Sequence, residues 1–226
     1  MSAPRTARDR ARAELTQEIK NEARRQLGEV GANGLSLRAV ARELGMVSSA
    51  LYRYFPSRDQ LLTALIIDAY NALGEAAEAG DDPSQTPLRR WELIWGATRA
   101  WALAHPHEYA LIYGSPIPGY QAPQDTVTPA ARVALALIRV IESAPLHPSD
   151  EGPSIGAELR EQAEALRSAL GSKLTPDDLC RLLFSFTQLF GTISFELFGQ
   201  YVGTAEPADP FFAYTAQQTG RLVGLG

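Results

Sequence analysis

The amino-acid sequence predicts an all-α protein. Apolar residues recur every three or four positions over long stretches, which is the spacing of one helix face, and no segment alternates as a half-buried strand does. Glycines, prolines and Ser or Thr caps divide these stretches into helix-sized pieces. At 226 residues and 45% hydrophobic content, the chain is long enough to bury a substantial core. We expect a domain of three short helices in residues 1–60 and a larger helical bundle in residues 61–226.

The first helix is expected from about Asp9 to Val30. Its apolar residues are four, four, four and three positions apart and therefore share one face: Leu15, Ile19, Ala23, Leu27 and Val30. Gly31 is a stop signal directly after them.

Two shorter helices follow. Ser36 is a favourable N-cap for the second helix, which Gly45 ends after about two turns. The third is expected over residues 48–54, and it is brief because Pro56 disfavours a helical conformation at Phe55.

The fourth helix begins with a capping box, SRDQ, in which Ser57 and Gln60 satisfy backbone N–H groups, and it is expected to run to about Ala79. Further helical patterns occur at 87–104, 106–113, 128–143, 157–170, 176–202 and 209–223. Two segments rich in turn-forming residues interrupt them, GSPIPGYQAPQD and PLHPSDEGPSIG, and we expect the second to be a mobile loop.

Charge is distributed unevenly along the chain. The net charge is −5, yet residues 1–60 carry eleven Lys or Arg against seven Asp or Glu, and the remainder carries ten against nineteen. A basic segment on an acidic chain is typical of a DNA-contacting module, because phosphate neutralisation needs local positive charge. A solvated basic helix is the alternative.

The remaining composition indicates a cytoplasmic protein. The N-terminal sequence MSAPRTARDRARAEL lacks the apolar core of a signal peptide, and no window approaches the length of a membrane-spanning helix. Cys180 is the single cysteine, which excludes an intrachain disulfide. The three histidines are not placed at a helical ligand spacing, so we expect no metal site and no cofactor.

A short helix ended by glycine, a tight turn and a second short helix form a helix-turn-helix arrangement, whose second helix enters the major groove of DNA. On a helix from Ser48, the side chains of Ser48, Ser49, Tyr52 and Arg53 project outward. The serines permit close approach to DNA, and Tyr52 and Arg53 suit phosphates or base edges. Arg58 adds a cation at the N-terminus of the fourth helix, where phosphate is favoured. The alternative is a compact three-helix core whose surface tyrosines have no role in DNA binding.

The segment LSLRAVARELGMVSSALYRYFPSRDQLL resembles the DNA-binding domain of the TetR-like (tetracycline repressor-like) transcriptional regulators, and the resemblance covers roughly residues 10–65. It implies these DNA contacts: Ser36, Arg38, Ser48, Ser49, Tyr52, Arg53 and Arg58. It implies mainly structural roles for Gly45, Leu51, Tyr54 and Phe55. Where the family often has serine, lysine and glycine, this chain has Val47, Ser48 and Ser49, so we expect the helix cap to shift to Ser48.

A second segment, WALAHPHEYALIYGSPIPGYQAP, resembles the C-terminal regulatory domain of the WHG-type branch of these regulators. The resemblance implies an all-α homodimer that binds a small molecule in its C-terminal domain and represses a nearby promoter. A symmetric dimer places two recognition helices on double-stranded DNA, so we expect a near-palindromic operator.

Aromatic residues in the 87–104 and 176–202 segments outnumber what one core-facing stripe requires. An aromatic-lined cavity with a few polar groups would suit a small hydrophobic or aromatic ligand. The candidate ligand contacts are Trp95, His107, Tyr109, Tyr113, Phe184, Gln188 and Thr192. The alternative is that these side chains fill the core.

The last two helices are expected to pair with those of a second subunit, because glycines that permit close approach occur in both: Gly191, Gly199, Gly220 and Gly224. Intrachain contact is the alternative. No phosphate-binding loop, nucleophile elbow or pair of acids on a helix face occurs, so an enzyme is the least favoured class. The alternative function is a small-molecule-binding protein or enzyme whose N-terminal bundle is not a specific DNA reader.

Overall fold

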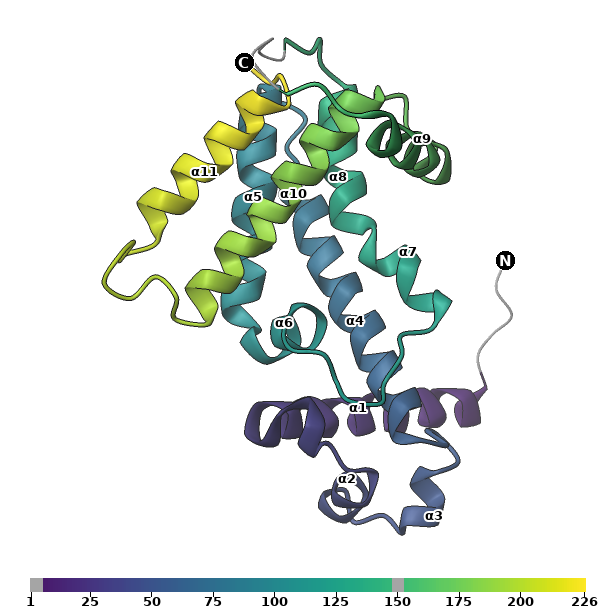
Figure 1. The fold of residues 1–226 in the computed structure, drawn as a ribbon. Helices are drawn as coiled ribbons and strands as arrows, with labels where there is room; N and C mark the ends of the chain where they lie inside the picture. Colours follow the sequence, from purple (N-terminus) through teal and green to yellow (C-terminus); the bar gives the residue numbers. More distant parts are fainter. Residues whose placement is uncertain (1–5, 148–152) are drawn as a thin grey trace. The chain divides into compact units, whose positions relative to one another are not determined.

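In the computed structural model, the described residues, 6–147 and 153–226, form α-helices and no strand (Figure 1), so the all-α prediction is confirmed. The helices are α1 (Ala7–Gly34), α2 (Leu37–Glu43), α3 (Ser48–Leu51), α4 (Arg58–Ala79), α5 (Pro87–Ala104), α6 (Pro106–Tyr113), α7 (Val127–Ala130), α8 (Arg132–Glu142), α9 (Ala157–Leu170), α10 (Pro176–Leu197) and α11 (Asp209–Leu222). A 3-10 turn, Gln124–Thr126, precedes α7. The middle of the second predicted loop, residues 148–152, lies outside the described residues.

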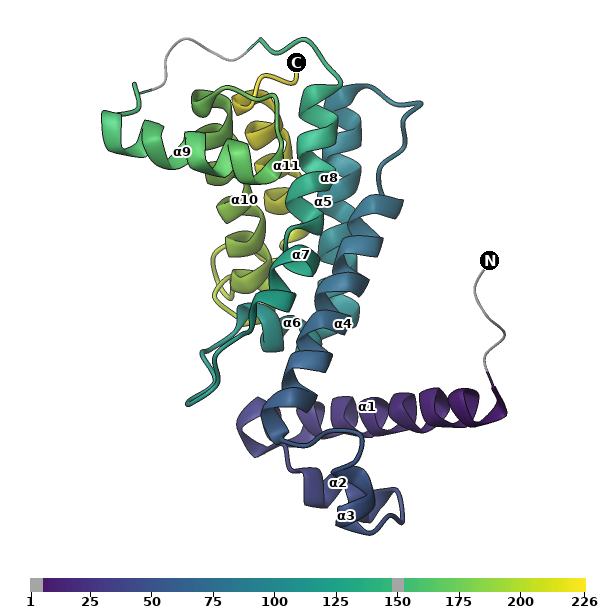
Figure 2. The ribbon, with the colours of Figure 1, turned by 90° about the vertical axis from the view of Figure 1, so that its right-hand side faces the viewer.

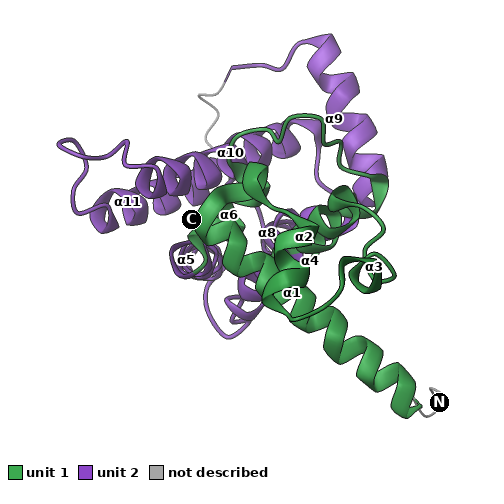
Figure 3. Ribbon diagram, turned by 90° about the horizontal axis from the view of Figure 1, so that it is seen from below, with its two compact units in different colours: residues 1–70, 105–127 green, residues 71–104, 128–226 purple. Residues whose placement is uncertain are grey.

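The chain forms two compact units (Figure 3). The first contains Met1–Tyr70 and His105–Val127, and the second contains Asn71–Ala104 and Thr128–Gly226. The boundary falls inside α4, and α6 belongs to the first unit. The sequence-based division after residue 60 separates a DNA-binding part from a regulatory part, and this functional division stays a prediction.

The core of the first unit is apolar. Of the α1 face predicted from the sequence, Ile19, Ala23 and Leu27 are buried and Leu15 is partly buried, but Val30 is exposed because it lies at the kink of Gly31. The other helices add further buried side chains: Val40 of α2, Leu51 of α3, Leu61, Leu62 and Leu65 of α4, and Leu111 of α6. Burying one such aliphatic side chain is worth about 1.5–3 kcal/mol, so these contacts hold the short helices in place.

Gly45 ends α2 as the sequence indicates, whereas Gly31 kinks α1 and does not end it, because helical structure resumes up to Gly34. Gly31 has a φ of 66° and a ψ of 176°, a conformation that is essentially restricted to glycine, and it kinks α1 before its last turn. Gly45 has a φ of 64°, and its N–H and that of Met46 donate to the carbonyls of Arg42 and Ala41 at 3.1 and 2.8 Å. This is a Schellman motif, which satisfies carbonyls at the end of α2.

The start of α3 differs from the expectation. Val47, not Ser48, is the N-cap, and no side chain caps the helix. Ser48 is the first helical residue, and the helix ends at Leu51 instead of Tyr54, with a turn over residues 52–54. The prediction of a shifted cap was wrong. Val47 has the extended backbone of an N-cap residue, so the helix begins after it although its side chain cannot accept a hydrogen bond.

The second unit is built around α5, which lies beside α8, α10 and α11 (Figures 1 and 2). Trp91 and Trp95 of α5 are fully buried, and the Trp91 indole N–H donates to the carbonyl of Ala216 in α11 at 3.1 Å. Gly220 of α11 lies so close to α5 that a Cβ atom there would be 2.5 Å from Leu88. Gly220 therefore permits close contact with a helix of its own chain, which was the alternative to a contact with a second subunit.

A single arginine ties three helices of this unit together. Arg99 of α5 donates to both carboxylate oxygens of Glu196 in α10, at 2.7 and 2.6 Å, and to Asp209 of α11 at 3.0 Å. Its guanidinium also lies 5.0 Å from the ring centroid of Phe212. Bidentate pairing with a carboxylate is the strongest geometry that an arginine adopts.

Two predicted helices have different bounds in the structure. The helix expected over 176–202 ends at Leu197, because Gly199 has a φ of 74° and Gln200 donates back to the carbonyl of Phe195 at 2.8 Å. Gly199 is thus a Schellman glycine and not a close-approach glycine inside the helix. The helix expected over 128–143 is divided at Ala131 into α7 and α8.

The core position of Leu51 gives a stability prediction. Leu51→Ala should lower the free energy of unfolding by roughly 2–5 kcal/mol, because it removes a fully buried side chain from a closed core. Val47→Ala is the control: Val47 is 70% exposed, so its loss should change stability by less than about 0.5 kcal/mol. Chemical denaturation measures both, and equal stabilities for the two variants would contradict this packing.

Candidate nucleic-acid interface

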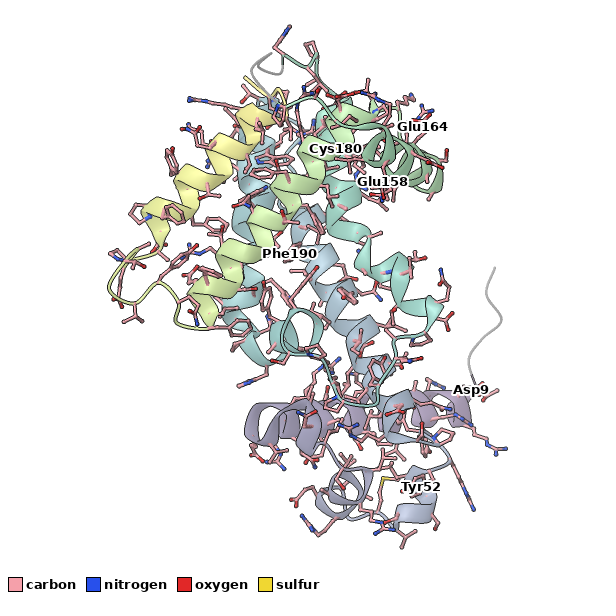
Figure 4. The ribbon with its side chains drawn as sticks, viewed as in Figure 1. Asp9, Tyr52, Glu158, Glu164, Cys180 and Phe190 are labelled. Carbon is pink, nitrogen blue, oxygen red and sulfur yellow. The ribbon has the colours of Figure 1, made fainter. Side chains whose placement is uncertain are left out.

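Six of the seven side chains predicted to contact DNA lie on α2 or α3 or directly beside them, and the seventh, Arg58, is the first residue of α4. Ser36 is the N-cap of α2, and its Oγ accepts the Ala39 N–H at 3.4 Å. Ser49, Tyr52 and Arg53 are exposed, and Figure 4 places Tyr52 beside α3. Tyr52 keeps 41% of its surface exposed although the residue before it, Leu51, is fully buried.

Four of the seven predicted contacts surround one surface hollow of about 320 Å³. Its lining residues are Leu35, Ser36, Leu37, Arg38, Tyr52, Ser57 and Arg58. The hollow lies at the N-terminus of α4, where the Ser57 Oγ accepts the Gln60 N–H at 3.2 Å. The positive end of a long helix, a phenol and two guanidinium groups together favour an anionic group such as a DNA phosphate. Ser48, Ser49 and Arg53 are not part of this lining.

Arg58 has structural contacts that the sequence did not indicate. Its Nε donates to the carbonyl of Leu35 at 3.1 Å, and its Nη2 donates to the carbonyl of Ala32 at 2.6 Å. These bonds fasten the start of α4 to the end of α1, and they orient the guanidinium at the edge of the hollow. A contact between Arg58 and DNA stays a prediction.

The cations of the first unit divide into paired and unpaired groups. Lys20 and Arg24 of α1 both bond Asp68 of α4, at 2.9 and 2.6 Å, and Arg24 also bonds Glu108 of α6 at 3.0 Å. Arg38 and Arg53, in contrast, form no ion pair with any described residue. Unpaired cations are the ones available to replace the counterions of DNA.

The seven predicted ligand contacts are divided between the two units. His107, Tyr109 and Tyr113 lie on α6 in the first unit, where the two tyrosine rings are 5.2 Å apart and burial raises the pKa of Tyr113. Trp95 and the three α10 residues lie in the second unit.

Within α10, the predicted ligand contacts differ in exposure. Phe184 is exposed, Gln188 is half-buried and Thr192 is buried, with its hydroxyl donating to the carbonyl of Gln188 at 2.6 Å.

The second unit holds two features that the sequence did not reveal. A groove of about 870 Å³ runs between α5 and α11; Gly96, Ala97, Arg99, Phe212 and Tyr214 are among its lining residues, and none of the predicted ligand contacts is. The indole N–H of Trp95 is buried and has no hydrogen-bond acceptor among the described residues. An unsatisfied buried donor costs about 1–3 kcal/mol, so an acceptor placed there would be bound favourably.

The described residues offer neither a membrane-spanning helix nor a metal site. No helix among them is long and apolar enough to cross a bilayer. No group of three or more His, Cys, Asp or Glu side chains is arranged there to hold a metal ion.

Comparisons with known proteins agree with this arrangement. Residues 19–65 match the family model described as bacterial regulatory proteins, tetR family, and residues 91–219 match the model described as tetracyclin repressor-like, C-terminal domain. The chain is 38% identical over 225 residues to the HTH-type transcriptional regulator Rv1816 of Mycobacterium tuberculosis, covering 95% of this chain and 93% of that protein.

Solved structures show the same fold. The crystal structure of the regulatory protein SCO4313 has a TM-score of 0.80 and 32% identity, covering 96% of this chain and 98% of the other. The TetR family transcriptional regulator PfmR of Thermus thermophilus has a TM-score of 0.55 at 16% identity, covering 92% and 97% of the two chains, and supports the fold alone. With family models on both parts of the chain and a relative that spans nearly all of it, this chain belongs to the TetR family of DNA-binding transcriptional regulators.

Proposed function

We propose that this protein is a cytoplasmic repressor that binds a near-palindromic operator as a homodimer and releases it when a small hydrophobic or aromatic ligand binds. The observation that carries the proposal is the hollow at the N-terminus of α4, where Arg38 and Tyr52 meet a helix start beside the recognition helix. The proposal includes no catalytic activity and no cofactor.

The chemistry of the recognition surface suits double-stranded DNA. Ser48 and Ser49 at the start of α3 are small enough for the backbone to approach base edges closely. Tyr52 and Arg38 at the hollow are suited to phosphate, and the unpaired Arg53 is suited to a phosphate or a guanine edge. Phosphate contacts fix the register, and the contacts from α3 to base edges supply specificity.

An exposed aromatic face on α10 supports a homodimer. Phe184, Gly191, Phe195 and Phe198 lie on one side of this helix by their spacing, and all four are exposed. Beyond its chain neighbours and its own helix backbone, a Cβ atom at Gly191 would have no atom within 4 Å, so another helix could approach it closely. Exposed aromatic side chains grouped on one helix face typically mark a protein interface, and a self-complementary helix pair suits two-fold symmetry.

Regulation requires a mechanical link to the DNA-reading helices, and the first unit contains one. The N-terminal half of α4 supplies Leu61, Leu62 and Leu65 to the core that holds α2 and α3. Arg24 of α1 joins Asp68 of α4 and Glu108 of α6 through its guanidinium. A ligand that displaces α4 or α6 would therefore displace the recognition helices as well, and a shift of a few ångströms misaligns two half-sites that lie about 34 Å apart.

Trp95 supports the proposal that a small ligand binds in the second unit. Its ring contacts those of Trp91 and Phe212, with centroid distances of 5.9 Å to each, and its N–H lacks a partner among the described residues. An apolar ligand with one hydrogen-bond acceptor would suit this position, because it could pack against the aromatic rings and accept the unpaired N–H.

A symmetric DNA motif is the first expected outcome. Selection from a random duplex library with purified protein should recover a near-palindrome, because each recognition helix covers one half-site. On the selected duplex, Tyr52→Phe should weaken binding by roughly 1.5–3 kcal/mol, the worth of a hydrogen bond to a charged group. Tyr54→Phe is the matched control, because Tyr54 packs against the core and not at the hollow.

Two results would contradict the DNA-binding part of the proposal. One is a selection that enriches no symmetric sequence at moderate salt. The other is a Tyr52→Phe variant that binds the selected duplex as tightly as Tyr54→Phe does. Turnover of a small molecule, together with DNA binding that is independent of sequence, would favour the alternative of an enzyme or small-molecule-binding protein.

The homodimer is expected to dissociate when charge is introduced on the α10 face. Phe195→Glu should give monomers, because an interface cannot bury an unpaired carboxylate without a large free-energy cost. Val127→Glu changes a residue of matched exposure, 53% against 52% for Phe195, and should leave the dimer intact. Analytical ultracentrifugation separates these outcomes, and a dimeric Phe195→Glu protein would place the interface elsewhere.

Ligand binding is expected to depend on Trp95 and not on Trp91. A thermal-shift screen of hydrophobic compounds that carry a carbonyl acceptor should identify stabilising ligands, and these should weaken operator binding by about 5–150-fold. Trp95→Phe should lower their affinity up to about tenfold, the worth of one hydrogen bond. Trp91→Phe should leave ligand affinity unchanged but destabilise the protein more than Trp95→Phe does, because it removes the hydrogen bond to the Ala216 carbonyl. Stabilising compounds that leave operator affinity unchanged would contradict the inducer model.

A further inference from the structure

The first two turns of α1 extend beyond the core of the first unit. Residues 6–14 are all exposed, and the first side chain of α1 to pack against the core is that of Leu15. In Figure 3 the N-terminal part of α1 continues past α2 and α3. A helical segment without buried side chains receives no stabilisation from packing, so its length does not serve the core.

This extension carries unpaired positive charge. Arg8, Arg10 and Arg12 form no ion pair with any residue in the described part of the chain. Asp9 is the acid of the first turn, and it is engaged by Thr6, whose hydroxyl and backbone N–H donate to the carboxylate at 2.7 and 3.1 Å. Glu14 is the other acid of the segment.

The helical spacing determines which of these arginines face the recognition helix. Arg8 and Arg12 continue the face of α1 that buries Ile19 and Ala23 against the other helices of the unit, since they precede Leu15 by seven and three residues. The position of Arg12 agrees with this assignment of faces, because its guanidinium lies 5.6 Å from the ring centroid of Tyr54 in the turn after α3. Arg10 is two residues from Arg8, about 200° around the helix, and therefore faces the opposite side.

We propose that the first two turns of α1 are a second part of the DNA interface, in which Arg8 contacts a backbone phosphate flanking the site read by α3 and Arg12 supports this contact from beside Tyr54. The inference rests on the proposed DNA-binding function. The contact is electrostatic and independent of base sequence, because an arginine on an exposed helix face reaches phosphate oxygens without a fixed fit to base edges.

Arg8 and Arg10 form a matched pair for the test, because both are exposed arginines of the same helix but lie on opposite faces. Affinity of full-length wild type, Arg8→Gln and Arg10→Gln is measured across a salt series for the selected operator and for a random-sequence duplex. Arg8→Gln should reduce the slope of log affinity against log salt by about 0.9 for each phosphate that is no longer neutralised, and should weaken binding to both duplexes by the same factor. Arg10→Gln should keep the wild-type slope.

Equal slopes for the two variants, whether both unchanged or both reduced, would overturn the inference, because the effect would then be absent or a matter of net charge alone. Thermal unfolding should give the same midpoint for both variants and the wild type, since both side chains are exposed. A wild-type protein that binds neither duplex would instead overturn the proposed function, so the two failures are distinguishable.

Discussion

The surface predicted to read DNA depends on the burial of two side chains, Leu51 and Phe55. An isolated helix needs about 12–15 residues to persist in water, and α3 has four. Its position is therefore set by Leu51 and Phe55, which are almost fully buried in the core formed with α1, α2 and α4. Because these residues point inward, Tyr52 and Arg53 between them point outward. The core of the unit thus determines which side chains the predicted DNA-binding surface exposes.

The cations of the first unit are likewise of two kinds: some are paired with acids between helices, and others are unpaired on the surface. Lys20 and Arg24 are paired with Asp68, and they brace α1 against α4. Arg38, Arg53 and the arginines at the start of α1 have no acidic partner among the described residues, and they face solvent. A chain with a net charge of −5 therefore still presents a cationic surface where its anionic partner is expected.

The sequence predicted features whose cause is local. The bounds of α5, α6 and α9 agree with the expected ranges because prolines, caps and glycines within a few residues specify them. Features with a distant cause were missed. The carbonyls that hold Arg58 come from a segment more than twenty residues away, and periodicity did not show that Gly199 takes a left-handed conformation that ends α10.

The candidate site shows the same limit. The spacing of Ser49, Tyr52 and Arg53 indicated one exposed face, but a hollow lined by three separate stretches of sequence could not be derived from spacing. The ligand candidates fell into two units because helical periodicity identifies a buried face and not the helix that covers it.

The discontinuous first unit has a consequence for biosynthesis. Domains fold as units while the chain leaves the ribosome, from the N-terminus onward. The helix-turn-helix segment is complete early, but Leu111 and Glu108 of α6, which complete its core and its ionic network, are made only after the intervening 71–104 segment. A nascent chain that ends before α6 therefore carries an incomplete first unit, in which the apolar surface that α6 covers is still exposed. Translation must pass α5, the first helix that lies wholly in the second unit, before the helix-turn-helix segment can reach its final packing.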